Sequence, residues 1–282
     1  MKPPKNFGDK VNADTLIAKK AFENSPDTFE NVMRYADVFF DGYTDTLFGH
    51  PSGHKGGQDA VEAIQNFAGS NKIQDFYTDN APELLFAGKQ AGLVHRTSTP
   101  DMPQANGLAE SKIRSVKEGT TTILECAGIT PISFWPQAME YFCRVRNFVM
   151  RDGDSAYNKR HVKGHLPRKR LPFGSLVDFM PVPQKMVDNM PFTPKMTAGI
   201  FAGWHMHAGG KWSGDYYIYP LADFVWNKEQ TRWGVVLAQR AKEIFWDAKA
   251  DGYQFPLREV YVKFTRTHGG MAVSLNRLKR TF

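Results

Sequence analysis

Cysteine is scarce in this sequence. Only Cys126 and Cys143 occur among its 282 residues, and both lie in stretches whose pattern predicts a helix. Two cysteines cannot build a disulfide framework or supply the cysteine ligands of a usual structural zinc site. We therefore expect a protein of a reducing compartment.

Long hydrophobic runs are also missing. No stretch approaches the roughly 18 apolar residues of a membrane-spanning helix. The first residues, Met1 to Asn6, lack the apolar segment of a signal peptide. Low-complexity tracts and internal repeats are absent as well. These features predict an intracellular protein without a membrane partner.

Positive charge is in excess and is unevenly distributed. The formal net charge is +7, with 23% charged and 41% hydrophobic residues, a composition typical of a globular protein. Two segments hold much of the basic charge: Arg151, Lys159, Arg160, Lys163, Arg168, Lys169 and Arg170 in the first, and Arg258, Lys263, Arg266, Arg277, Lys279 and Arg280 in the second. Such segments fit a polyanionic partner, although two solvated surfaces would explain the charge equally well.

Hydrophobic periodicity predicts an α/β domain in residues 1–150. Strands and helices are expected in the order strand 9–16, hairpin 35–48, helix 58–67, strand 73–78, helix 83–90, strand 93–97, helix 108–126 and helix 134–150. A loop rich in proline and glycine should precede the long helix. The order indicates a sheet with flanking helices.

The rest of the chain has a different pattern. A basic linker is expected at 151–172, followed at 173–225 by short apolar runs that proline and glycine separate. Several short strands of this kind predict a small β-barrel or sandwich. Residues 226–282 form a basic C-terminal extension whose role the pattern does not reveal.

Three carboxylates are predicted at the ends of different elements. Asp14 should end the first strand, Asp79 should follow the strand 73–78, and Glu110 should lie in the first turn of the long helix. Carboxylates that converge in this way can hold Mg²⁺, which prefers oxygen ligands. Three acids among 29 are unremarkable by themselves, because most acidic residues are solvated.

Several motifs together resemble the integrase of copia-type retrotransposons, which is related to retroviral integrases. From about Gly8 to Phe224 they occur in the family order, as GDKVNADTL, YADVFFDGYTD, FYTDNAPEL, TSTPDMPQANGLAES, FWPQA, GIFAGW and YYIYPLADF. The resemblance implies an RNase H-like mixed sheet with flanking helices in residues 1–150. It also implies a small all-β, SH3-like module after the linker.

The resemblance makes Asp14, Asp79 and Glu110 a catalytic triad that binds Mg²⁺ or Mn²⁺, with two ions expected. The implied activity is that of a polynucleotidyl transferase, which processes the 3′ ends of transposon DNA and joins them to a target duplex. An RNase H-type nuclease is the alternative enzyme. A domesticated or defective core that only binds DNA or a protein partner is the alternative without catalysis.

Candidate DNA-binding residues are expected near the triad and in the linker. Arg114 and Lys117 lie four and seven residues after Glu110, so all three share a helix face. Both cations are expected to bind phosphates, although a simple ion pair between Glu110 and Arg114 is an alternative. Asn80 either orients the substrate or caps a turn. In the linker, the expected DNA contacts are Lys163, Arg168, Lys169 and Arg170.

Other polar and aromatic residues are assigned to structure. Asp41 precedes Gly42 in a turn signal, so we place it in the turn and not in the catalytic site. His161 and His165 have the spacing of half a zinc site, but without nearby cysteines they are expected to be solvated or to face phosphate. Trp204, Trp212 and Tyr216 are expected in the core of the β-module rather than stacked on bases.

The motifs cover only part of what the family contains. The zinc-binding module that normally precedes the core, the protease and the reverse transcriptase have no counterpart in this sequence. We therefore expect a piece of a polyprotein, a domesticated gene or a decayed copy. The resemblance further implies a homo-oligomer that acts on DNA in the nucleus, or resides in a cytoplasmic virus-like particle before nuclear entry.

Overall fold

The computed structural model describes residues 3–18, 33–97, 103–129, 131–165, 171–181, 192, 194–224, 237–246 and 252–259, with only the backbone at 103–106 and 131–133. The chain divides into two compact units, each described by itself. The first comprises Met1–Thr122, Pro131–Lys169 and His207–Lys211, and the second comprises Ile123–Thr130, Arg170–Met206 and Trp212–Phe282.

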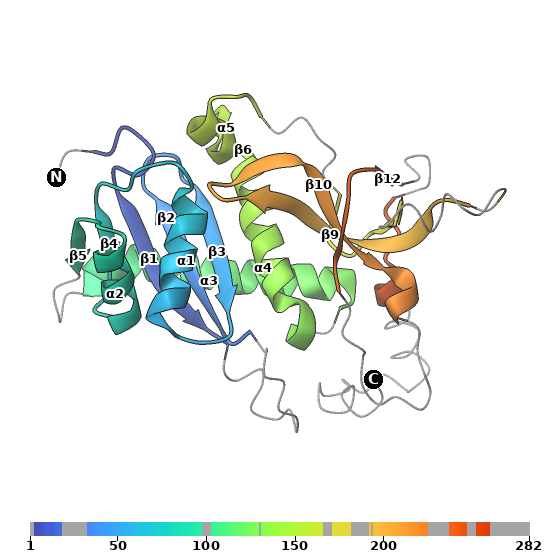
Figure 1. The fold of residues 1–282 in the computed structure, drawn as a ribbon, viewed down its shortest axis with the longest axis horizontal. Coiled ribbons are helices and arrows are strands. Elements are labelled where there is room, and N and C mark those ends of the chain that lie inside the picture. The colour runs from blue at the N-terminus through green and yellow to red at the C-terminus, as the bar shows by residue number, and fades with distance from the viewer. Residues whose placement is uncertain are drawn as a thin grey trace, which may run out of the picture. The chain divides into compact units, whose positions relative to one another are not determined.

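The first unit is built on a five-stranded mixed sheet (Figure 1). In the order β3-β2-β1-β4-β5, the central strand β1 pairs antiparallel with β2 and parallel with β4. Strand β3 is antiparallel to β2, and β5 is parallel to β4. The five strands are β1 (Val11–Ile17), β2 (Tyr35–Asp41), β3 (Leu47–Ser52), β4 (Phe76–Thr78) and β5 (His95–Thr97). This topology confirms the mixed sheet with flanking helices that the sequence predicted.

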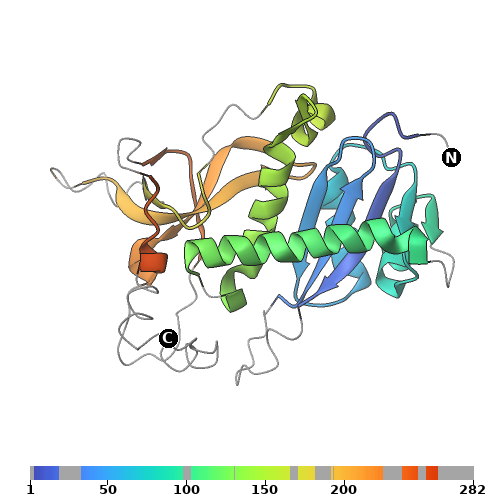
Figure 2. The ribbon, with the colours of Figure 1, turned by 180° about the vertical axis from the view of Figure 1, so that it is seen from behind.

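The two faces of β1 have different neighbours. Side chains alternate along a strand, so Val11 and Ala13 join Phe39 in the core beneath helix α1 (Gly57–Ala68). By the same alternation Asp14 lies on the opposite face of the sheet. Helix α3 (Pro103–Ala127) covers that face (Figure 2). On that face the Lys112 ammonium of α3 lies 3.9 Å from the centre of the Phe40 ring of β2.

Close helix packing supports the sheet. Helix α4 (Pro131–Phe148) crosses α3 at Gly119, where an added Cβ would lie only 2.1 Å from Cε2 of Phe142. Helix α4 is also tied to β3, because the Asn147 side chain accepts from the Leu47 N–H at 2.9 Å and donates to the Leu47 carbonyl at 2.7 Å. Helix α2 (Pro82–Gln90) packs beside α1, where Phe86 contacts Gly57.

Part of the expected linker is folded. Strands β6 (Met150–Arg151) and β7 (Asp154–Ser155) form a short antiparallel hairpin, and α5 (Ala156–His161) follows it directly. The Ser155 side chain caps α5 by accepting from the Asn158 N–H at 3.1 Å. A hairpin of two-residue strands is too short to produce a recognisable sequence period, so the pattern indicated only a linker.

Arg160 in α5 has a structural role. Its guanidinium lies 3.8 Å from the centre of the Phe7 ring and donates to the carbonyls of Phe67 and Ala68, at the C-terminal end of α1. A cation at this end of a helix offsets the partial negative charge of its free carbonyls. Burial lowers the pKa of Arg160 to about 10, so the side chain remains charged at neutral pH.

The second unit contains a five-stranded sheet of order β11-β10-β9-β8-β12, whose pairings at both ends are antiparallel. Its strands are β8 (Leu176–Phe179), β9 (Thr197–His207), β10 (Lys211–Pro220), β11 (Gln239–Ala241) and β12 (Ile244–Phe245), and the 3₁₀ helix η2 (Leu221–Phe224) follows β10. The predicted small all-β module therefore has a matching sheet, while its SH3-like closure stays a prediction.

Aromatic residues form the core of this sheet, as expected for Trp204 and Tyr216, both of which are buried. Trp212 is half-buried and donates its indole N–H to the Asp215 carbonyl at 2.8 Å. The sheet also continues past residue 225, where the sequence indicated an extension, because β11 and β12 pair with β10 and β8. These two strands are too short for the pattern to reveal.

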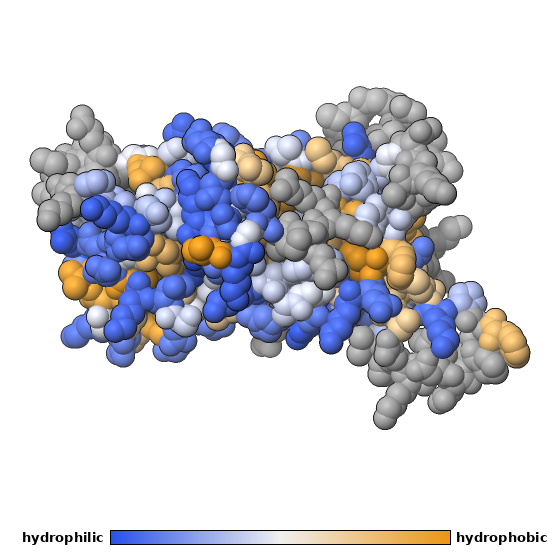
Figure 3. All heavy atoms as spheres, turned by 90° about the horizontal axis from the view of Figure 1, so that it is seen from above, coloured by the Kyte–Doolittle hydropathy of each residue, from blue (hydrophilic) through white to orange (hydrophobic). Residues whose placement is uncertain are grey.

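The face in Figure 3 is mostly hydrophilic, and its hydrophobic residues occur in small groups. Within the part of the chain that the structure describes, no helix has the length and apolar character needed to cross a membrane.

Candidate active site

Asp14 lies in the middle of β1, not at its end as the sequence pattern indicated. The ladder with β2 continues for three residues beyond it, to the pair of Ile17 and Tyr35, because β2 supplies partners that the pattern of β1 alone cannot reveal. The Asp14 carboxylate is half-buried and accepts the N–H of Thr15 at 2.7 Å.

Asp79 directly follows β4, as predicted. It is half-buried, and its Oδ1 accepts the Ala81 N–H at 3.1 Å, which fixes the turn that leads into α2. Asn80 beside it is exposed, which leaves its predicted role in orienting the substrate untested.

Glu110 lies about two turns into α3 rather than in its first turn, because the helix already begins at Pro103. Proline is favoured at such a start, and the preceding turn formers had suggested a longer loop. Glu110, Arg114 and Lys117 are all exposed, as expected for one solvent-facing helix face. Among the described residues no ion pair joins Glu110 to Arg114, so the simple salt bridge is not formed.

The charges of Asp79 and Glu110 act on Asp14. Burial raises the pKa of Asp14, and the negative charges of Asp79 and Glu110 raise it further. The Thr15 N–H and the Lys55 ammonium partly oppose this rise in pKa. Three acids from β1, from the loop after β4 and from α3 therefore share one electrostatic neighbourhood.

Such a donor set fits a divalent cation chemically. Carboxylate oxygens are the ligands that Mg²⁺ prefers, and a cation would relieve the repulsion at Asp14. In the side-chain positions of the described residues, no group of three His, Cys, Asp or Glu converges closely enough to hold one ion. A shared ion would therefore require these carboxylates to move closer together, and the triad stays a prediction.

A second polar cluster begins at Thr15, the residue after Asp14, and was missed by the sequence analysis. The Thr15 hydroxyl donates to Oδ1 of Asp37 on β2 at 2.8 Å, and the same hydroxyl oxygen is 3.5 Å from Oε1 of Glu83. The ammonium of Lys55 lies 2.9 Å from Oε1 of Glu83. The one sequence signal was a charged residue, Asp37, within the apolar strand YADVFF.

Asp37 gives this cluster a pH dependence. Its side chain is buried, with 5% exposure, and this burial, followed by the charges of Glu83 and Asp59, raises its pKa to about 6 against the opposing hydrogen bond from Thr15. The folded protein therefore holds the proton more tightly than the unfolded chain does. Stability from this group is present below about pH 4 and is lost as the pH rises to about 6.

Asp37→Asn should consequently stabilise the protein at neutral pH, because asparagine still accepts from Thr15 without carrying a buried charge. We expect the free energy of unfolding to rise by roughly 1–3 kcal/mol at pH 7.5, with the gain vanishing near pH 4. Denaturant titrations of both proteins at the two pH values measure the difference. A gain of equal size at both would show that charge is not its cause.

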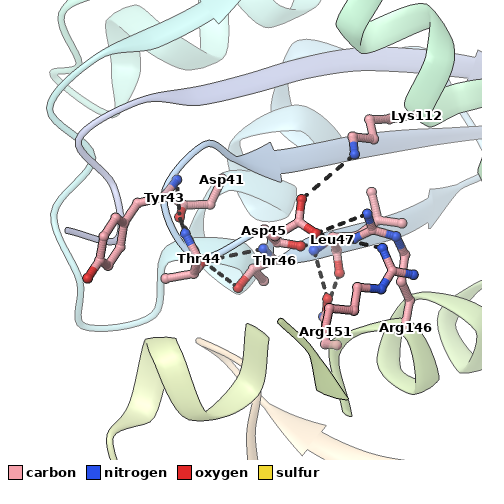
Figure 4. A network of polar contacts seen from close by, with 10 residues as sticks. Asp41, Tyr43, Thr44, Asp45, Thr46, Leu47, Lys112, Arg146 and Arg151 are labelled. Atoms are coloured by element: carbon pink, nitrogen blue, oxygen red, sulfur yellow. Dashed lines mark hydrogen bonds and ion pairs between the residues drawn. The ribbon is translucent and has the colours of Figure 1, made fainter. Parts of the chain in front are cut away.

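Asp41 has the structural role predicted for it. Its fully buried carboxylate accepts the N–H of Gly8 at 2.8 Å and both the N–H and the hydroxyl of Thr44 at 2.7 Å (Figure 4). These bonds shape the connection between β2 and β3 and anchor the segment before β1. Asp41 therefore belongs to the turn.

Asp45, in the same connection between β2 and β3, lies near three cationic side chains (Figure 4). Its carboxylate lies 3.8 Å from Lys112, 3.3 Å from Arg146 and 3.7 Å from Arg151, and its carbonyl accepts from Arg146 at 2.9 Å. Arg151 belongs to the first basic segment of the sequence. Its ion pair with Asp45 connects β6 to the turn between β2 and β3. The Asp45 backbone has a φ of 64°, a conformation that aspartate tolerates better than most residues.

The remaining residues of the basic segment differ in their surroundings. His161 is half-buried against the Tyr157 ring, and burial followed by the charge of Arg160 lowers its pKa to about 4. His165 is exposed, with Nδ1 3.0 Å from the Ser155 hydroxyl. Lys163 is exposed. The other predicted contacts of this segment lie outside the described residues, namely Arg168, Lys169 and Arg170.

Comparisons with known proteins identify relatives of part of the chain. The retrovirus-related Pol polyprotein from transposon RE1 of Arabidopsis thaliana is 32% identical over 124 residues, which cover 41% of this chain and 8% of the polyprotein. The corresponding polyprotein from transposon RE2 of the same plant is 31% identical over 112 residues, covering 37% of this chain and 8% of the polyprotein. No model of a known protein family matches the chain.

Among solved structures, the catalytic core domain of BIV integrase aligns with 54% of this chain and 92% of its own, at 13% identity and a TM-score of 0.39. The chain's match spans only 8% of either polyprotein's length, so it corresponds to one segment of much longer proteins. Over about two fifths of its length the chain is therefore similar to retrovirus-related Pol polyproteins, which confirms the resemblance to copia-type elements seen in its motifs.

Proposed function

We propose that this chain is an integrase core that cuts and joins DNA strands. The arrangement that carries the proposal is Asp14 on β1, Asp79 directly after β4 and Glu110 on α3, where the charges of Asp79 and Glu110 raise the pKa of Asp14. The family order of the motifs and the similarity to Pol polyproteins support it. The whole activity comprises processing of transposon 3′ ends and transfer of those ends to a target duplex.

In this proposal Asp14, Asp79 and Glu110 hold Mg²⁺ or Mn²⁺. Bound divalent ions would supply Lewis-acid activation of the attacking oxygen and stabilisation of the leaving oxygen. Arg114 and Lys117 bind phosphates beside the scissile bond from the face that carries Glu110. Asn80, next to Asp79, orients the DNA strand.

No side-chain nucleophile is needed for this chemistry. The oxygen of water attacks phosphorus and releases a strand with a free 3′ hydroxyl, whose oxygen then attacks a phosphate of the target and displaces the target strand's 3′ oxygen. Burial raises the pKa of the Cys143 thiol to about 12, so this cysteine is unsuited to act as a nucleophile. Both substrates, the transposon end and the target duplex, are therefore DNA. We place the reaction in the nucleus and assign it to an oligomer of this chain.

The test is a strand-transfer assay with the full 282-residue chain and a duplex that carries a transposon end. We expect joined products with Mg²⁺ or Mn²⁺ and none with a chelator, because carboxylates alone cannot activate the attacking oxygen. Cleavage of an RNA–DNA hybrid without joining of DNA would favour the RNase H-type nuclease. Tight DNA binding without any metal-dependent product would favour the non-catalytic alternative.

A further inference from the structure

Lys55 lies in the connection between β3 and α1. Its ammonium contacts Oε1 of Glu83 at 2.9 Å, in an ion pair whose partners are unequally buried: 37% of the Lys55 side chain is exposed, against 8% of that of Glu83. The buried partner is thus the acid, and the cation lies between it and solvent.

Glu83 is held in place from two sides. It lies in the first turn of α2, where the helix dipole favours an acid, and Oγ1 of Thr15 is 3.5 Å from its Oε1. Because a flexible lysine side chain loses freedom when it is paired with a fixed partner, this contact sets the direction of the ammonium. An ordinary surface lysine would not be aimed in this way.

The ammonium also lies in the field of the two catalytic candidates. The hydrogen bond to Glu83 is the main cause of the raised pKa of Lys55, and the charges of Asp79 and Asp14 add to it. In the opposite direction, Lys55 lowers the pKa of Asp14. A positive group with three donors, partly exposed to solvent and held by Glu83, therefore lies within electrostatic reach of Asp14 and Asp79.

We propose that Lys55, aimed by Glu83, binds a phosphate of the DNA strand next to the phosphate that reacts at Asp14 and Asp79. This inference rests on the proposed function, because that function supplies the DNA strand. Lys55 is a substrate-binding residue in this arrangement, and Glu83 is a positioning residue that acts through it. One ammonium hydrogen faces Glu83, which leaves the others for the phosphate oxygens.

The first test compares Lys55→Met with Lys89→Met, which removes an exposed lysine near the C-terminal end of α2. Binding of the full chain to a duplex carrying a transposon end is measured over a range of salt concentrations without divalent ions. Lys55→Met removes an ammonium that binds one phosphate. The slope of log affinity against log salt concentration should therefore be smaller by about 0.9, and the affinity at 0.1 M salt should fall by roughly five- to tenfold. Lys89→Met should match the wild type.

The second test concerns Glu83. Glu83→Gln keeps the charge of Lys55, so the salt slope should stay unchanged, while the rate of strand joining should fall several-fold because the ammonium is no longer aimed. In the Lys55→Met background Glu83→Gln should cause no further loss, as expected for two residues that act as one unit. Lys55→Arg, which keeps the charge and the pairing with Glu83, should restore most of the affinity.

Lys55→Met leaves Glu83 buried beside an apolar side chain and could fold poorly. Lys55→Met/Glu83→Gln removes both charges and therefore provides a second measurement of the slope. A wild-type slope and affinity in either folded variant would overturn the proposal. If the slope falls but the wild type joins no DNA with Mg²⁺ or Mn²⁺, Lys55 binds phosphate and the proposed catalytic function is the part that fails.

Discussion

Asp79→Asn is expected to lower metal-dependent strand transfer by roughly 1,000-fold, which corresponds to about 4 kcal/mol of lost transition-state stabilisation. The substitution removes one charged ligand but keeps the shape of the side chain. Asparagine can still accept the Ala81 N–H through its Oδ1, the bond that shapes the start of α2. Removing the charge also relieves repulsion on Asp14, so the metal-free fold should be at least as stable as the wild type.

Strand transfer under single-turnover conditions measures this loss, and thermal unfolding without metal checks the fold. Asp178→Asn is the matched control, because Asp178 is an exposed aspartate on β8 in the second unit. It should leave both measurements unchanged. Activity of Asp79→Asn equal to that of the wild type would remove Asp79 from the catalytic residues.

Neutralising Arg114 and Lys117 together should impair the reaction more than it impairs binding. We expect the rate at saturating DNA to fall about 100-fold, as is typical when preorganised donors at a reacting phosphate are removed. Arg114→Gln/Lys117→Gln keeps helix-forming residues at both positions, and both side chains are exposed, so α3 should remain folded. Saturating DNA separates the loss of rate from any loss of affinity.

Neutralising the linker charges should have the opposite effect. With Lys163, Arg168, Lys169 and Arg170 replaced by glutamine, we expect the salt slope to flatten by roughly 0.9 for each phosphate that the chain no longer neutralises, while the rate at saturating DNA stays near that of the wild type. This second variant is the control for the first. An unchanged salt slope would mean that the linker is an ordinary solvated surface. Equal losses of rate in both variants would contradict the different roles proposed for the α3 cations and the linker cations.

The sequence predicted most elements of the first unit because their signals are local. The alternation around Val11 and Phe39, the helical spacing of Ala60 and Ile64, and the polar stop after Thr78 are properties of neighbouring residues. Their structural counterparts are β1, β2, α1 and β4. Boundaries were less predictable, because β1 extends through pairing with β2, and α3 starts at a proline that also fits a loop.

The sequence by itself determined the chain's similarity to copia-type Pol polyproteins, the mixed sheet with flanking helices, and the three acids that are the first to test. Each of these conclusions depends on residue order alone. Only the tertiary structure decided three interactions. The charges of Asp79 and Glu110 raise the pKa of Asp14. Arg160 donates to a carbonyl at the C-terminal end of α1 instead of facing solvent, and Lys55 pairs with Glu83. These interactions join residues far apart in the chain, and their energies depend on burial and on the distance between charges, which no sequence period encodes.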